Sequence, residues 1–441
     1  MDGVLAKDNF HKDTFHFFLS WWTMPKINRK LIGCLAAFTF FMACETSNNP
    51  LDSIMQSDAP GIKRIADNLE EHEVQILYTQ IDRDDAGNPT FTEYGFQLDS
   101  MAYFYPASTA KMPVAILALQ RLKELNKVLP EHRQLSKELP FIFGVQKGDQ
   151  RAQYSFKDWD PKSKVSPFML DTTHQEGVAT IGHMIKKIFL VSDNDAYNYL
   201  FEFLGRDYVN QELRIRNIGP AHINHKFQVG ADNKNMQDFT FHYYDTYMVV
   251  TGTKSKVDKH SYPLTGMVKG VGYADNEGQV VNEPFDFNEK NYFSIQSLNQ
   301  ILKAVIFPET LPENDRFDLT EEDYEFLRYW MSRNALESEY PNYNDGEHWD
   351  SYVKFFMYGD TKEPMPENVR IYNKVGMAYG TLTDVAYIQD KENGVEFMLT
   401  ATVHINENGI FNDGVYEYDE LGLPFLAELG RQVYDYELKR K

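Results

Sequence analysis

Residues 108–122, STAKMPVAILALQRL, contain the helix signal on which the rest of the fold assignment is built. Apolar residues recur there at helical spacing, which predicts a helix from Ser108 to about Asn126 with Pro113 tolerated in its first turn. A lysine three residues after a serine lies over it on a helix and can accept the proton that a nucleophilic hydroxyl must lose. Ser108 and Lys111 are therefore a candidate nucleophile and base, and a helix-capping serine is the alternative.

Strands near both chain ends enclose a helical middle. Strands are predicted over 74–81, 90–98, 385–388 and 396–403, helices over 62–69, 181–188, 194–204, 208–217, 294–306 and 321–331, and a closing helix over 423–438. This order predicts an α+β fold: an antiparallel sheet built from both chain ends and flanked by helices, plus a mostly helical subdomain.

One folded domain is predicted over residues 61–441. Its sheet part covers about 61–107 and 370–441, and its helical part covers about 108–369. A polar, aromatic-rich stretch at about 232–292 is interpreted as an insertion of elaborated loops.

Two further motifs follow the serine helix. They are SDNDAYN at residues 192–198 and KVGMAYGTLTDVA at residues 374–386. In this order the three segments resemble the signature set of the class A β-lactamases and penicillin-binding proteins, S-x-x-K, S-D-N and K-T-G, with matching flanks. The resemblance extends from about Gln75 to Tyr436 and includes Tyr329-Trp330-Met331.

The resemblance implies roles for the motif residues in acylation. Ser108 attacks a carbonyl carbon, and its own N–H and that of Met377 stabilise the oxyanion. Lys111 accepts the serine proton, and Ser192 passes a proton to the leaving nitrogen.

The same resemblance implies three substrate contacts. Asn194 binds an amide carbonyl of the substrate and orients Lys111. Lys374 attracts the substrate carboxylate and also lowers the pKa of Lys111. Gly376 leaves room for ligand beside its strand.

Three positions depart from the class A pattern. The glutamate that activates the deacylating water is not found, since the E-x-x-x-N pattern is absent from residues 219–236 and Asp232 matches only by position. Val375 stands where Thr or Ser is usual, and Met377 where a small or hydroxyl residue is common. These changes affect turnover and recognition more than acylation.

Composition excludes several other classes of function. A formal charge of −21 argues against a nucleic-acid partner. No cofactor is expected, because the chain has no glycine-rich phosphate loop, and no metal is expected, because His222 and His225 have no third ligand nearby. The sequence does not indicate an oligomeric state.

The N-terminal region has the pattern of an export signal. Lys26, Arg29 and Lys30 precede an apolar run at 31–42, and the following Ala43-Cys44 completes a segment that resembles a bacterial lipobox. Cys44 is then a lipidation site, residues 1–44 an upstream extension plus signal peptide, and residues 45–60 a tether. The expected location is a periplasmic or outer-membrane lipoprotein, and a signal cleaved without lipidation or a buried helix are the alternatives.

These observations predict a serine hydrolase acylated at Ser108, most directly by the cyclic amide of a β-lactam. A D-alanyl-D-alanine peptidase acting on peptidoglycan-like peptides, another amidase or esterase, and a non-hydrolytic penicillin-binding sensor remain alternatives, because the deacylating glutamate is not found.

Overall fold

The computed structural model describes residues 49–144, 169–228, 236, 238–243, 245–252 and 262–441. Cys44, the predicted signal segment and Asp232 lie outside these residues. Within them, no helix is both long enough and apolar enough to cross a membrane.

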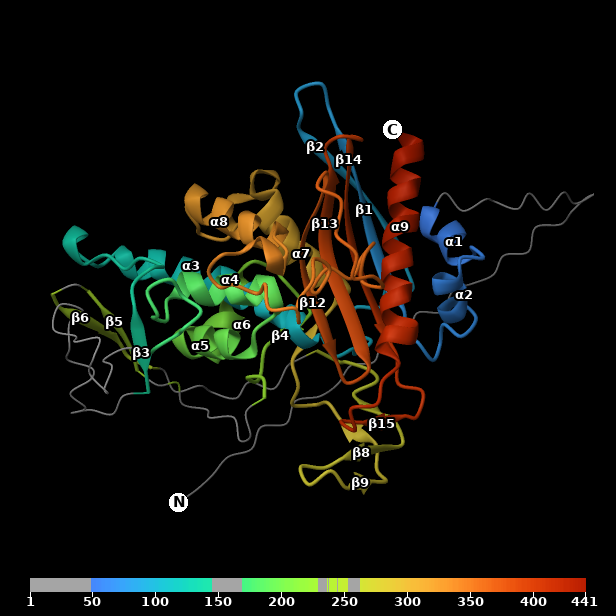
Figure 1. The fold of residues 1–441 in the computed structure, drawn as a ribbon, viewed down its shortest axis with the longest axis horizontal. Helices are drawn as coiled ribbons and strands as arrows, with labels where there is room; N and C mark the ends of the chain where they lie inside the picture. The colour runs from blue at the N-terminus through green and yellow to red at the C-terminus, as the bar shows by residue number, and fades with distance from the viewer. Residues whose placement is uncertain (1–48, 145–168, 229–235, 237, 244, 253–261) are drawn as a thin grey trace, which may run out of the picture. The chain divides into compact units, whose positions relative to one another are not determined.

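A five-stranded antiparallel sheet forms the centre of the fold (Figure 1). Its strand order is β12-β13-β14-β1-β2, so strands from the two ends of the chain meet where β14 pairs with β1. The predicted α+β class and the sheet built from both chain ends are therefore confirmed. The strands are β1 (Gln75–Arg83), β2 (Pro89–Phe96), β12 (Val369–Ala378), β13 (Thr381–Asp390) and β14 (Val395–His404).

Helices cover both faces of this sheet (Figure 1). One face carries α1 (Pro50–Met55), α2 (Pro60–Ala66) and α9 (Leu423–Arg440). The other side carries α3 (Lys111–Asn126), α4 (Ile181–Val191), α5 (Asn194–Leu204), α6 (Arg206–Ile215), α7 (Ile295–Ile306) and α8 (Glu321–Ser332).

The sheet separates two hydrophobic cores, because successive side chains of a strand point to opposite faces. On β13, Val385 and Tyr387 pack into the core formed with α3–α8, whereas Ala386 and Ile388 pack into the core formed with α1, α2 and α9.

Residues 50–55 belong to the folded domain and not to the expected tether. They form α1, whose Leu51 is fully buried, and the side chain of Asn49 donates a hydrogen bond to the Gly95 carbonyl at 2.9 Å. The prediction of a tether missed this helix because its apolar residues are few and spaced over less than two turns.

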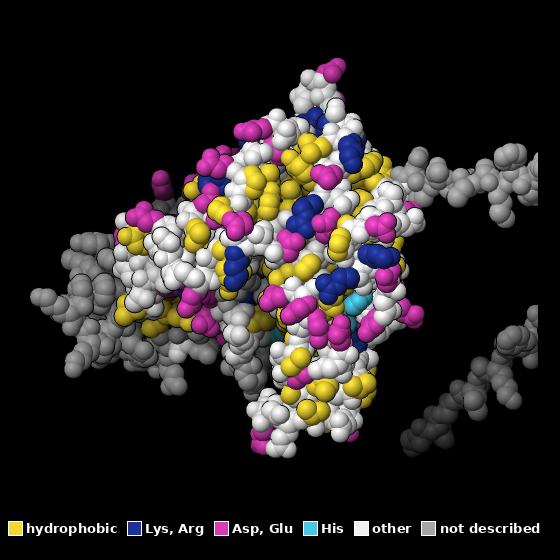
Figure 2. Space-filling model, turned by 45° about the vertical axis from the view of Figure 1, so that its right-hand side comes forward, with side chains coloured by type: hydrophobic (Ala, Val, Ile, Leu, Met, Phe, Trp, Pro, Cys, Tyr) yellow, Lys and Arg dark blue, Asp and Glu magenta, His cyan; other side chains and the backbone are white. Residues whose placement is uncertain are grey.

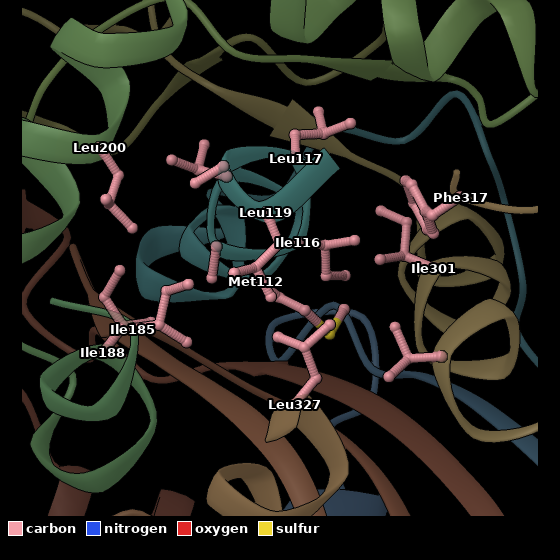
Figure 3. Close-up of a cluster of buried hydrophobic side chains, with 14 of the residues drawn as sticks. Met112, Ile116, Leu117, Leu119, Ile185, Ile188, Leu200, Ile301, Phe317 and Leu327 are labelled. Atoms are coloured by element: carbon pink, nitrogen blue, oxygen red, sulfur yellow. The ribbon is translucent and has the colours of Figure 1, made fainter. Parts of the chain in front are cut away.

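Helix α3 lies in the middle of the larger core (Figure 3). Residues 111–120 are buried all round the helix. Its side chains meet α4 and α5 on one side and α7 and α8 on the other, as Ile116, Ile185 and Ile301 illustrate. A helix that is apolar on every side belongs inside a core, and this position fixes the residues at its N-terminal end.

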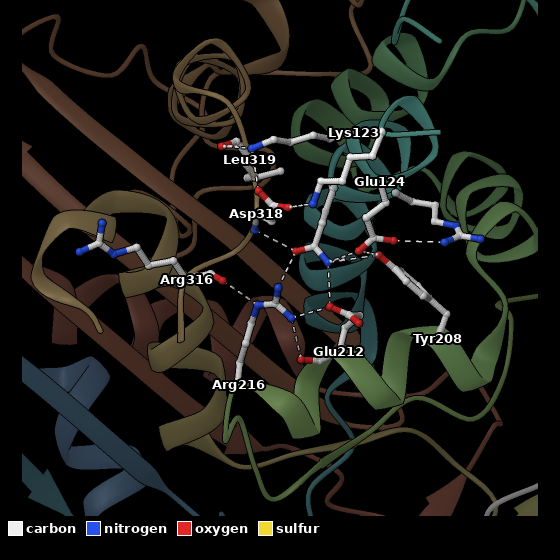
Figure 4. A network of polar contacts seen from close by, with 11 residues as sticks. Lys123, Glu124, Tyr208, Glu212, Arg216, Arg316, Asp318 and Leu319 are labelled. Atoms are coloured by element: carbon white, nitrogen blue, oxygen red, sulfur yellow. Dashed lines mark hydrogen bonds and ion pairs between the residues drawn. The ribbon is translucent and has the colours of Figure 1, made fainter. Parts of the chain in front are cut away.

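A polar network holds the other half of α3 (Figure 4). The buried Gln120 amide donates to the Tyr208 hydroxyl at 3.1 Å and to the Glu212 carboxylate at 2.7 Å. Its oxygen accepts from the Arg216 guanidinium at 2.7 Å and from the Asp318 N–H at 3.0 Å. These bonds tie α3 to α6 and to the segment before α8.

The stretch interpreted as an insertion contains short strands. A parallel pairing of β8 with β15 joins this stretch to the chain just after β14. The strands of this stretch are β5 (Phe239–His242), β6 (Tyr247–Val250), β7 (Val268–Lys269), β8 (Gly272–Ala274), β9 (Val280–Val281), β10 (Phe285–Asp286) and, at its end, β11 (Tyr292–Phe293). Other short strands outside it are β3 (Phe141–Phe143), β4 (Ala221–His222) and β15 (Ile410–Phe411).

Charged side chains of both signs are interspersed on the face of the molecule seen in Figure 2. No extended basic area is visible on that face, which agrees with the formal charge of −21.

Candidate active site

Ser108 lies in a tight turn immediately before α3. The helix was predicted to start at Ser108 but starts at Lys111, because residues Ala107–Ala110 form a 3-10 turn. The backbone N–H and the hydroxyl of Thr109 close this turn by donating hydrogen bonds to the Pro106 carbonyl. Ala107 has a φ of +45°, a conformation that non-glycine residues adopt rarely and that recurs at functional sites. Ser108 is partly exposed and lines a cavity of about 1160 Å³ at the positive end of the helix.

Lys111 is fully buried one turn further on. Its Nζ donates to Asn194 Oδ1 at 2.6 Å, to the Ser192 carbonyl oxygen, and to Ser192 Oγ at 3.4 Å. Burial lowers the pKa of Lys111 from 10.5 to about 7, although the charge of Asp193 opposes the shift. The amine is thus available as a base near neutral pH. Its direct hydrogen bonds are to these groups and not to Ser108 in the described structure, as is common for catalytic pairs without substrate.

Ser192 connects Lys111 to a second lysine. The residue follows α4 with a φ of +59°, which turns its side chain toward the sheet edge. Lys374 Nζ, on the edge strand β12, donates to Ser192 Oγ at 2.7 Å and to the Val375 carbonyl at 2.9 Å. Burial and the neighbouring Lys111 hold the pKa of Lys374 well below its usual value. The structure therefore brings Lys111, Ser192, Asn194 and Lys374 into one hydrogen-bonded cluster beside Ser108.

A buried polar layer that the sequence analysis missed supports β12 from behind. Lys354 Nζ donates to the carbonyls of Met331 and Ile371 and to Asn373 Oδ1, each at 2.8 Å. Asn373 in turn donates to Asp384 Oδ1 at 2.8 Å. The Asp384 carboxylate also accepts two backbone N–H groups, from residues 355 and 356.

The two ionisable groups of this layer are strongly perturbed by burial. It raises the pKa of Asp384 to about 6 and lowers the pKa of Lys354 to about 7. Asp384 is the aspartate of the 374–386 motif, whereas Lys354 belongs to no motif, so only its place in the fold identifies it.

Gly376 allows the backbone of β12 to lie close to the backbone of the turn that carries Ser108. It was expected to leave room for ligand, but a Cβ atom placed on it would lie 2.4 Å from the Pro106 oxygen and 3.1 Å from the Ser108 nitrogen. The glycine therefore lets β12 pack directly against the serine turn. The next residue, Met377, lines the cavity with a side chain that is 46% exposed.

An aromatic ring from the segment 219–236, in which the deacylating glutamate was not found, lies beside Lys111. The Phe227 ring centroid lies 5.1 Å from Lys111 Nζ. Asn198 fixes this residue, because its side chain bonds both the N–H and the carbonyl of Phe227 at 2.9 Å. In the described part of the chain, no carboxylate is hydrogen-bonded to Lys111. Asp232 lies outside the described residues.

The rest of the cavity wall is aromatic and charged. Tyr105 stacks on His225 with ring centroids 6.2 Å apart, and burial lowers the pKa of His225 to about 4, so that its ring is neutral. Four charged side chains from the same region also line the cavity: Lys226, Asp286, Glu289 and Lys290.

Acylation of Ser108 is expected to accelerate as the pH rises through about 7, because Lys111 must be neutral to accept the serine proton. Between pH 6 and pH 8 the neutral fraction of a lysine with this pKa, and with it the acylation rate, rises about tenfold. The rate of adduct formation, followed by intact mass across this range, checks the prediction. A rate that is constant or falls as the pH rises contradicts it.

Residues 61–242 match the sequence model of the β-lactamase enzyme family, a range that includes Ser108, Lys111, Ser192 and Asn194 and ends before Lys374. The β-lactamase resemblance seen in the motifs is thereby confirmed for these residues. No curated protein sequence matches the chain.

Several solved structures that are similar to this chain are β-lactamases. The β-lactamase from Sphaerobacter thermophilus is 14% identical to this chain; the alignment covers 86% of this chain and 98% of that protein, with a TM-score of 0.42. The β-lactamase from Xanthomonas campestris is 15% identical; the alignment covers 88% of this chain and 98% of that protein, with a TM-score of 0.43. A class A β-lactamase from Mycobacterium abscessus is 13% identical to this chain. The alignment covers 82% of this chain and 93% of that protein, with a TM-score of 0.41.

Proposed function

We propose that this chain, whose residues 61–242 match the β-lactamase enzyme family, is a serine hydrolase in which a β-lactam amide acylates Ser108. One observation carries the proposal: the Ser192 hydroxyl lies between two buried lysines, 2.7 Å from Lys374 Nζ and 3.4 Å from Lys111 Nζ. This arrangement provides a path for a proton from the nucleophile to a leaving group on the far side of the carbonyl.

Acylation then proceeds in two steps. Neutral Lys111 accepts the proton of Ser108 Oγ while that oxygen bonds to the amide carbonyl carbon, and the carbonyl oxygen becomes an oxyanion. The start of α3 offers N–H groups and positive potential to this oxyanion, and the N–H of Met377 is the second donor that the resemblance implies.

Collapse of the oxyanion breaks the carbon–nitrogen bond. Ser192 gives its proton to the leaving nitrogen and is reprotonated by Lys111, which donates to Ser192 Oγ in the free protein. The product is an ester on Ser108, and the protons balance because Lys111 returns to its neutral form.

Hydrolysis of this ester is expected to be slow. A general base contributes about two to four orders of magnitude to such a step. Among the described residues no carboxylate is hydrogen-bonded to Lys111, and the apolar ring of Phe227 lies beside its amine. The proposed enzyme therefore accumulates its acyl form.

The cavity also favours a second candidate, an amidase or peptidase for a larger linear substrate. Small-molecule sites typically enclose about 300–1000 Å³. The cavity at Ser108, at about 1160 Å³, exceeds that range and offers room for a larger substrate.

Incubation of residues 48–441 with a labelled penicillin separates these functions. Mass spectrometry follows the adduct while absorbance follows opening of the ring. We expect one adduct per chain that forms quickly and decays slowly. Rapid ring opening without a detectable adduct contradicts slow deacylation, and failure to form any adduct contradicts β-lactam acylation and leaves linear amides as the substrates to examine.

We further propose that the protein is exported and anchored through a lipid on Cys44, since Ala43-Cys44 ends an apolar run of lipobox type. Metabolic labelling with a fatty acid in a bacterial host is expected to label the wild type and to leave Cys44→Ser unlabelled. Label that persists in Cys44→Ser, or a wild type that takes up none, rejects the anchor.

A further inference from the structure

The strand that carries Lys374 lies at the edge of the central sheet. Among the described strands β12 pairs only with β13, and an edge strand leaves a row of backbone groups without a strand partner. The buried polar residues Asn373 and Lys374 also interrupt the apolar alternation that fixes a strand on a core. Lys374 Nζ nevertheless lies 2.7 Å from Ser192 Oγ, so other contacts must hold β12 in place.

Lys354 provides contacts of this kind. Its Nζ donates at 2.8 Å to the carbonyl of Ile371 in β12, to the carbonyl of Met331 in the last turn of α8, and to the side-chain oxygen of Asn373. Three acceptors use all three hydrogens of an ammonium group, which fixes the direction of each bond. One buried amine therefore joins the backbone of β12, a side chain of β12 and the end of α8.

Asn373 continues these contacts directly behind Lys374. Its side-chain nitrogen donates to the Val353 carbonyl at 2.9 Å and to Asp384 Oδ1 at 2.8 Å. Neighbouring residues of a strand point to opposite faces. Asn373 therefore faces away from the cluster around Ser108, and its bonds fix the strand from the side opposite to the Lys374 amine.

The charges of this layer are balanced and lie within electrostatic range of Lys374. Lys354 is 1% exposed and Asp384 is fully buried, and Asn373 joins them. Burial and Lys111 account for most of the lowered pKa of Lys374, whereas Asp384 opposes the shift and Lys354 adds to it. Lys354 is not among the described residues that line the Ser108 cavity, so any effect on the reaction is indirect.

We propose that Lys354 is a positioning residue for acylation, which holds β12 where Lys374 reaches Ser192. The inference rests on the proposed function, in which Ser192 protonates the leaving nitrogen, and adds to it a residue outside the three motifs. Because Lys354 acts through β12 and Lys374, its loss affects a step that needs the proton of Ser192 more than a step that does not.

Two acyl donors with different leaving groups test this inference. The amide nitrogen of a penicillin must be protonated as it leaves, whereas p-nitrophenyl acetate releases nitrophenolate, which leaves as a stable anion. Lys354→Met is expected to slow acylation by the penicillin about tenfold to a hundredfold, the effect of a displaced reacting group, and to leave acylation by the ester unchanged. Intact mass follows the penicillin adduct, absorbance follows nitrophenolate, and Ser108→Ala provides the blank.

Two further variants separate positioning from stability. Lys354→Met leaves Asp384 as an unpaired buried charge, so the double variant Lys354→Met/Asp384→Asn, which removes both charges, is measured beside it. We expect the same dependence on the leaving group in both. Ile65→Ala is the stability control, because this fully buried residue lies in α2, which packs against α9, and its truncation opens a cavity in the core. It is expected to lower the melting temperature and to leave both acylation rates unchanged.

A crystal structure of the double variant provides a readout that does not depend on acylation. Lys374 Nζ is expected to lie beyond hydrogen-bond distance of Ser192 Oγ. An unmoved Lys374, equal slowing with both donors, penicillin acylation at the wild-type rate, or the same selective loss in Ile65→Ala overturns the inference. Failure of the proposed function is distinct, since a wild type that forms no penicillin adduct leaves the crystallographic test of Lys374 intact.

Discussion

Replacing Lys111 by methionine is expected to slow acylation of Ser108 by about two to four orders of magnitude, the usual contribution of a general base. Methionine retains the length and apolar stem of the buried side chain but cannot accept a proton. Asn194 and Ser192 lose a hydrogen-bond donor, so their positions loosen as well. Stopped-flow measurement of adduct formation with a chromogenic β-lactam checks the prediction.

Lys111→Arg separates the positive charge of this lysine from its ability to accept a proton. Arginine keeps the positive charge but remains protonated at any pH at which the protein is folded. We expect it to be as slow as Lys111→Met, and thermal unfolding of both variants controls for misfolding. Near-normal acylation by Lys111→Arg would show that the lysine acts as a cation and not as a base.

Gly376→Ala is expected to cost about a hundredfold in acylation, because the new Cβ would lie 2.4 Å from the Pro106 oxygen and force β12 away from the serine turn. A displacement of about 1 Å at reacting groups has that effect. The overpacking is also expected to destabilise the fold by about 1–3 kcal/mol. Acylation kinetics and chemical denaturation measure the two effects.

Gly87→Ala is the control for Gly376→Ala. Gly87 lies in the turn between β1 and β2, has a φ of +84° and has no atom within 4 Å of its Cβ position. It therefore incurs backbone strain without moving the active site, and its acylation rate is expected to match the wild type. Normal acylation in Gly376→Ala would mean that the close approach of β12 is not needed for catalysis.

Helices and strands could be predicted from the sequence where apolar residues recur at the regular spacing of a helix or a strand. Helix α5 was predicted at its observed bounds, 194–204, because a capping aspartate and a terminal glycine mark its ends. Strand β12 gave no such signal of its own, because the buried residues Asn373 and Lys374 interrupt its apolar alternation. Only the family resemblance indicated a strand there.

The motifs predicted candidate site residues that the structure brings together, but they did not show how those residues are held. Lys354 and its contact with Asn373 depend on a loop approaching the sheet from a distance in the sequence, which no local pattern reveals. Phe227 was missed because an aromatic residue in a loop is common and does not by itself indicate a site. Its place beside Lys111 is set by hydrogen bonds from Asn198. The second asparagine of SDNDAYN was the available signal.

Peptide mapping of the penicillin adduct tests the central claim, acylation of Ser108, most directly. Wild-type protein quenched in acid after seconds, digested and sequenced by mass spectrometry is predicted to carry one penicilloyl group on the peptide that contains Ser108, and Ser108→Ala is predicted to carry none. A wild type without an adduct, or an adduct that remains in Ser108→Ala, contradicts the account.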